Sequence, residues 1–89
     1  MNDKELEQML LDNDLEGVSF FTGDNYATAI LGYTEDGNLV YSYDGMVDWL
    51  MDNDDMDDIS AREWIDYNVI RTIPYMGEKK PVIVYTLYG

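Results

Sequence analysis

The residues of this chain that could do chemistry are almost all carboxylates. Seven aspartates fall within a short central stretch, at Asp44, Asp48, Asp52, Asp54, Asp55, Asp57 and Asp58. Carboxylates can bind a hard cation, transfer protons as a pair, or attract a basic partner. The first two uses require a defined geometry, whereas the third requires only charge at a suitable spacing.

A calcium or magnesium site is the first possibility, since both ions take oxygen ligands. An EF-hand loop requires oxygen ligands at its first, third and fifth positions and glycine at its sixth. Counted from Asp52, the fifth residue is Met56 and the sixth is Asp57, so the pattern fails. We expect no metal site here but a solvated acidic loop, with weak calcium or magnesium binding by residues 52–58 left open.

Catalysis has little support in the sequence. It contains no Cys and no His, which removes thiol nucleophiles, imidazole acid–base catalysis and the usual zinc ligands. Paired carboxylates hydrolyse glycosides only when a cleft holds them at a fixed separation, and 19 acids among 89 residues supply such pairs by chance. We therefore predict that the protein is not an enzyme and uses no cofactor.

The net charge is −14, from 19 acidic and five basic residues, and its distribution is uneven. From Glu5 to Ala61 there are 15 acids and no Lys or Arg. Such a field repels nucleic acid and anionic membrane, and it attracts basic surfaces with fast, salt-sensitive association. We therefore expect a basic protein partner and no direct contact with nucleic acid or membrane.

Apolar residues at i, i+3 and i+4 spacing predict three helices that must position these carboxylates. The helices are expected at residues 2–12, from Asp44 as the capping residue to about residue 51, and from Asp57 or Ser60 to about Arg71. The second helix then carries Asp44 and Asp48 on one face. Residues 51–58 form the loop that follows it.

Alternating β-favouring residues predict strands at Val18–Phe21, Tyr26–Thr34, Leu39–Tyr43 and Pro81–Leu87. The middle two form a hairpin around Gly37, which suits a positive φ. Residues 1–89 are expected to form a single α+β domain in the order α-β-β-β-α-α-β. Its predicted architecture is a small antiparallel sheet of three to four strands with helices packed on one face.

The eight Tyr and two Trp residues admit two interpretations, because aromatic side chains fill cores and also dominate binding hot spots. Trp49 and Trp64 fall on the predicted helices and are expected in the core. Two or three of the ten are expected to be exposed for binding.

A rigid row of carboxylates could occupy the groove in which a protein grips DNA, since Arg pairs with carboxylate as it does with phosphate. The row would run from Asp44 and Asp48 into residues 52–58. A charge of −14 also exceeds the roughly 2–8 units that solubility requires. The leading hypothesis is a DNA mimic that inhibits a nucleic-acid-binding protein. The alternative is a non-inhibitory interaction domain, acidic for solubility.

The C-terminal half carries the motif E-W-I-D-Y-N-x-I-R-x-x-P-Y-x-G, from Glu63 to Gly77. Over residues 39–85 the chain resembles a group of small uncharacterised bacterial and prophage proteins, a resemblance that implies no activity. In size and acidity it is similar to phage anti-restriction and anti-CRISPR proteins, several of which mimic DNA. With no apolar run of membrane-spanning length and no cationic N-terminal signal, the expected location is the cytoplasm.

Overall fold

The computed structural model describes residues 3–15, 17–21 and 26–87. Its elements are α1 (Asp3–Asp12), the 3₁₀ helix η1 (Tyr26–Ala29), β1 (Ile30–Tyr33), β2 (Leu39–Ser42), α2 (Tyr43–Asn53), α3 (Asp58–Asn68), the 3₁₀ helix η2 (Ile70–Tyr75) and β3 (Val82–Val84). The protein is therefore α+β, as predicted. Without the 3₁₀ helices, the described elements follow the order α-β-β-α-α-β.

The sheet has three strands in the order β1-β2-β3, and it is mixed. β1 and β2 form the predicted antiparallel hairpin, with Gly37 at φ +86° in its turn. β2 and β3 are parallel, with Val40 opposite Val82, so the prediction of a wholly antiparallel sheet is wrong. The physical reason is the connection: α2, α3 and η2 return the chain to the start of β2, and β3 then runs in the same direction.

Two of the predicted strand segments adopt other structures. Residues 18–21 form no strand; they pack against the core as an irregular segment, in which Ser19 N donates to the carbonyl of Lys79 at 3.0 Å. The predicted strand at residues 26–34 begins only at Ile30. Tyr26 and Ala29 are both buried, and a 3₁₀ turn brings residues three apart onto one side. The last strand is also shorter than predicted, at Val82–Val84.

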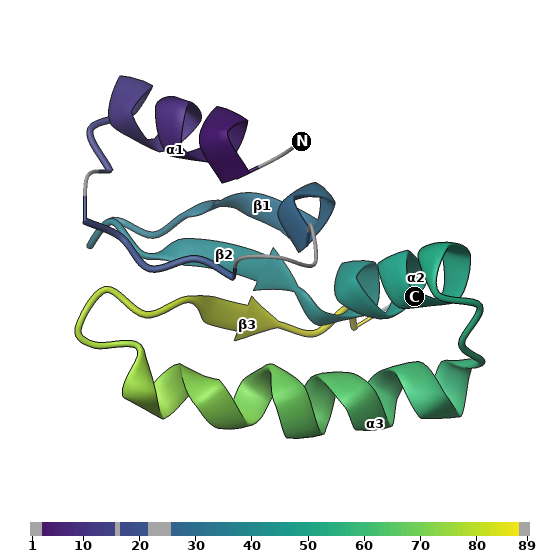
Figure 1. Cartoon of the computed structure of the whole chain (residues 1–89). Coiled ribbons are helices and arrows are strands. Elements are labelled where there is room, and N and C mark those ends of the chain that lie inside the picture. The colour runs from purple at the N-terminus through teal and green to yellow at the C-terminus, as the bar shows by residue number, and fades with distance from the viewer. Residues whose placement is uncertain (1–2, 16, 22–25, 88–89) are drawn as a thin grey trace.

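One hydrophobic core lies against one face of the sheet. Its largest fully buried side chains come from four different elements, and they are Tyr26, Tyr41, Met46, Val47, Leu50 and Ile65. Leu39 and Tyr41 of β2 are buried, whereas Val40 and Ser42 between them are only partly covered. In Figure 1, α1 lies alongside β1 and α3 lies alongside β3. The helices thus pack as predicted, and they leave the opposite face of the sheet less covered.

The boundaries of α2 and α3 determine where the carboxylates lie. Ser42, not Asp44, caps α2, because its Oγ accepts a hydrogen bond from Gly45 N at 3.0 Å. α2 continues to Asn53, so the predicted loop at residues 51–58 shortens to residues 54–57. Asp57 caps α3, as one of the two predicted starts proposed, and Ser60 lies within its first turn.

Candidate functional site

The seven predicted partner-binding aspartates lie on α2, on the turn after it and at the start of α3. Asp44, Asp48 and Asp52 belong to α2, Asp54, Asp55 and Asp57 to the turn, and Asp58 to α3. This turn lies at one end of an elongated molecule measuring 37 × 26 × 23 Å (Figure 1). The structure therefore brings these residues to one region, but it does not leave all of them free.

Asp57 and Asp58 have structural roles in α3. Asp57 Oδ1 accepts a hydrogen bond from Ser60 N at 2.7 Å, and this bond holds the pKa of Asp57 below its usual value. The Nε of Arg62 donates to both oxygens of Asp58, at 3.0 and 3.1 Å. The sequence predicted that these two side chains bind a partner. In the structure Asp57 caps α3 and Asp58 forms an ion pair within it, so both residues stabilise the helix.

Asp44 joins the start of α2 to the end of β3. Its Oδ2 accepts a hydrogen bond from Thr86 N at 2.8 Å, and Arg62 Nη2 lies 3.7 Å from its Oδ1. The hydrogen bond from Thr86, aided by the charge of Arg62, lowers the pKa of Asp44. Its carboxylate is thus largely committed within the chain, and sequence reasoning could not find Thr86 or Arg62 as its partners.

Four of the predicted carboxylates remain available to a partner: Asp48, Asp52, Asp54 and Asp55. All four residues are exposed. Among residues 3–15, 17–21 and 26–87, none of their carboxylates makes a hydrogen bond or an ion pair. We call these four residues the acidic end.

The backbone fixes the spacing within the acidic end. Asp48 and Asp52 are four residues apart on α2, which separates them by about 6 Å along the helix axis. Asp55 has φ +54°, a left-handed conformation that aspartate adopts more readily than most residues. Duplex DNA presents one phosphate per about 3.4 Å of axis on each strand. The axial spacing between Asp48 and Asp52 is therefore wider than the phosphate spacing of a DNA strand, but of the same order.

Two of the basic residues, Arg62 and Lys79, are engaged by other groups of the chain. Arg62 contacts Asp44 and Asp58, and it also lies over the Tyr43 ring, 5.6 Å from the ring centroid. Lys79 donates to the carbonyl of Asp36 beside the hairpin turn. Neither cation is placed to neutralise the acidic end, which keeps its negative field.

Metal binding has no geometric support in the part of the chain that the structure describes. There, no group of three or more Asp or Glu side chains comes close enough to hold an ion. Successive aspartates of the acidic end are spread along a helix and a turn, so their oxygens do not converge. In the same described residues, no helix is long and apolar enough to cross a membrane.

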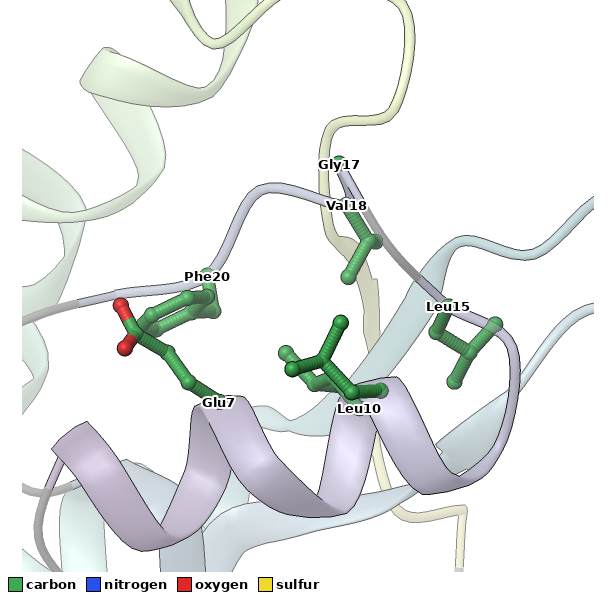
Figure 2. A pocket seen from close by; sticks show the side chains of 7 residues that line it. Glu7, Leu10, Leu15, Gly17, Val18 and Phe20 are labelled. Carbon is green, nitrogen blue, oxygen red and sulfur yellow. The ribbon is translucent and has the colours of Figure 1, made fainter.

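A separate pocket of about 230 Å³ lies between α1 and the segment that follows it (Figure 2). Leu10, Leu15, Val18 and Phe20 line it with other residues, and among the described lining residues Glu7 supplies a carboxylate. Small-molecule sites are usually about 300–1,000 Å³ and contain several convergent polar groups. The acidic end does not contribute to the pocket.

Among the residues that the structure describes, the exposed aromatic side chains are Tyr33, Trp64, Tyr67, Tyr75 and Tyr85. That two or three of them are exposed for binding stays a prediction. Trp49 packs against the core, with its ring centroid 5.7 Å from that of Tyr26, as expected. Trp64 was expected in the core but is 41% exposed, because α3 turns Ala61 and Ile65 inward and leaves Trp64 on its flank.

Comparison with models of protein families, with curated proteins and with solved structures finds no match.

Proposed function

We propose that this protein is a binding domain whose acidic end docks onto the basic surface that another protein uses to hold nucleic acid. In its concrete form the domain acts as a DNA mimic and inhibits that protein, as an anti-restriction or anti-CRISPR protein does. The proposal includes no catalytic step, in keeping with a chain that contains no His and no Cys.

The observation that carries the proposal is the difference between the two groups of aspartates. Asp44, Asp57 and Asp58 are bound to groups of the chain itself. The four residues of the acidic end are exposed and, among the described residues, unpaired. Like charges held close together lower the stability of a folded protein. A cluster of this kind, left without cations, is consistent with selection for a partner's cations.

Electrostatics also supports a particular kind of complex. A field from 14 net negative charges accelerates encounter with a basic surface, and salt screens it over about 8–10 Å at physiological ionic strength. Arg and Lys side chains that bind phosphate bind carboxylate through the same donors. We therefore expect fast, salt-sensitive association that competes with DNA.

A non-inhibitory interaction domain, acidic for solubility, is the second candidate. It is favoured by exposed acids outside the acidic end. Among them are Glu7 in α1, Asp14 just after α1, and Glu35 and Asp36 in the hairpin turn. If solubility alone explains the charge, then the positions of the acidic residues should not affect binding. Only the number of charges should affect any interaction with basic proteins.

The test is capture of partners from a bacterial lysate on the immobilised protein, at low and at moderate salt. The proposal predicts that the captured proteins bind nucleic acid, and that added duplex DNA or added salt releases them. Partners that resist high salt and ignore competing DNA would contradict it. An uncharged polymer at the same mass concentration as the DNA controls for release by crowding.

A further inference from the structure

The outer side of α3 and η2 carries a second exposed feature next to the acidic end. Figure 1 shows the two elements running on as one rod along one side of the molecule. Ala61, Ile65 and Val69 turn inward. On a helix with 3.6 residues per turn, Glu63 and Tyr67 then lie nearly opposite Ile65 and face outward.

Aromatic rings are exposed along this rod. Tyr67 is 69% exposed, Tyr75 is 89% exposed, and Trp64 is 41% exposed. Trp, Tyr and Arg are the residues enriched in binding hot spots, and Arg71 completes the set. We call Glu63, Trp64, Tyr67, Arg71 and Tyr75 the aromatic face. Its first residue, Glu63, is six residues beyond the cap Asp57, which places it about 9 Å further along the axis of α3.

Within the molecule, two arginines already lie over tyrosine rings, as a partner's guanidinium group could lie over a ring of the aromatic face. Arg62 lies 5.6 Å from the Tyr43 ring centroid while its Nε donates to Asp58. Arg71 lies 5.4 Å from the Tyr67 ring centroid. Arg62 thus combines the buried ring of Tyr43 with a carboxylate, whereas Arg71 uses the exposed ring of Tyr67.

A carboxylate and a ring are also neighbours on the aromatic face, where Arg71 lies over one side of the Tyr67 ring. Glu63 is one helical turn before Tyr67, a spacing that makes the two side chains neighbours. Glu63 is exposed, and among the described residues its carboxylate has no hydrogen bond or ion pair. The ring of Trp64, the best cation–π acceptor among side chains, lies on the adjacent flank.

We propose that the aromatic face binds an arginine-rich part of the partner's basic surface. Incoming guanidinium groups stack on Trp64 and on the side of the Tyr67 ring that Arg71 does not cover, and they pair with Glu63, while the acidic end attracts other cations of the partner. Arginine is favoured over lysine because its flat guanidinium stacks on rings and pairs with carboxylates through several donors. Charge complementarity also selects this occupant over a second copy of the chain, which carries the same −14. This inference rests on the proposed function.

Two labelled peptides, octa-arginine and octa-lysine, are suitable probes because they have equal charge. Their dissociation constants at one ionic strength are measured by fluorescence anisotropy for the wild type. The same two dissociation constants are measured for the double variant Trp64→Leu with Tyr67→Leu, which keeps apolar side chains but removes the rings. Two exposed stacking contacts predict a preference for octa-arginine of roughly three- to tenfold in the wild type. The preference should fall to about one in the leucine variant.

Two further variants separate this inference from the proposed function. Tyr33→Leu removes an exposed ring elsewhere and should leave the preference unchanged. Neutralising the acidic end should weaken both peptides equally and leave their ratio intact. Equal affinity of the wild type for the two peptides, or a preference that persists in the leucine variant, would overturn the inference. If neither peptide binds, or if neutralisation changes nothing, the proposed function itself fails. Circular dichroism of each variant confirms that the fold is retained.

Discussion

The carboxylate of Asp44 accepts a hydrogen bond from the backbone amide of Thr86 at 2.8 Å. This contact joins the first turn of α2 to the chain just beyond β3, across 42 positions of sequence. Next to it, the ring centroids of Tyr43 and Tyr85 lie 4.7 Å apart. The end of β3 is thus held by α2 through one charged and one aromatic contact, and Asp44 acts as a structural residue.

Replacing Asp44 with alanine should lower the free energy of unfolding by about 1 kcal/mol, the order of one hydrogen bond to a partly exposed charge. Asp44→Asn keeps an oxygen acceptor for Thr86 and should cost less. The matched control is Asp48→Ala, one turn further along α2, where no internal partner is lost. Urea unfolding followed by far-ultraviolet circular dichroism measures all three. An equal effect of the two alanine variants would contradict the structural role of Asp44.

Acid should remove this contribution in a defined pH range. Asp44 has a folded-state pKa below its ordinary value of 3.8, owing first to the Thr86 hydrogen bond. A depressed pKa means that the stabilisation is complete above the unfolded-state pKa and is lost as the pH falls through the folded-state pKa. The difference in stability between wild type and Asp44→Ala should therefore be constant above about pH 5 and shrink below pH 3.8. A difference that persists undiminished at pH 2 would contradict the assignment.

Tyr43 should ionise later than an ordinary tyrosine. Burial, the hydrogen bond to Asp66 and the charge of Asp66 together raise the pKa of Tyr43 to about 12. Because the folded-state pKa is the higher one, its contribution to stability is complete below pH 10 and is lost as the pH rises toward 12. When tyrosinate formation is followed by absorbance, the phase at the highest pH should belong to Tyr43 and should be absent from Tyr43→Phe. In Asp66→Asn that phase should move to lower pH, and an unchanged phase there would contradict the role of Asp66.

Gly45 should resist substitution although it lies within a helix. A Cβ at this position would lie 3.1 Å from Ala29 Cβ and 3.4 Å from Ala29 Cα. Gly45→Ala should therefore destabilise the fold by about 1–2 kcal/mol through overpacking, instead of gaining the roughly 1 kcal/mol of helix propensity. Combining it with Ala29→Gly should recover part of the loss. Strictly additive effects in this double-mutant cycle would contradict direct contact between α2 and η1.

The local features of the fold could be predicted from sequence because they depend on neighbouring residues. The apolar periodicity located all three α-helices, and Gly37 located the hairpin. The same logic failed where a distant contact decides the outcome. Residues 26–34 alternate like a strand, which would place Tyr26 and Ala29 on opposite faces, yet both side chains are buried on a 3₁₀ turn. The parallel pairing of β3 also depends on the path of the whole α2–α3 connection.

The candidate site was predictable in position but not in composition. The density of aspartates identified residues 44–58, and the spacing of Asp58 and Arg62 was itself a signal for an i, i+4 ion pair that went unused. Asp44 could not be recognised as structural, because Thr86 is its partner only through the fold. The exposure of Trp64 could not be predicted either, since a ring at the edge of an apolar stripe lies inside or outside according to the neighbouring segment.

The proposed binding surface depends on the position of the carboxylates and not on their number. Two variants with equal charge separate these possibilities, each changing the formal charge from −14 to −10. The first neutralises the acidic end through Asp48→Asn, Asp52→Asn, Asp54→Asn and Asp55→Asn. The second neutralises four exposed acids elsewhere, through Glu7→Gln, Asp14→Asn, Glu35→Gln and Asp36→Asn. Asparagine tolerates the left-handed backbone of Asp14 and Asp55.

The decisive measurement is the amount of protein that each variant captures from the fraction of a bacterial lysate that elutes from immobilised DNA, at fixed salt. The account predicts that the acidic-end variant captures on the order of tenfold less than the wild type, since several ion pairs are lost together. The control variant should stay within about twofold of the wild type. Equal losses in the two variants, or no loss in either, would contradict the account.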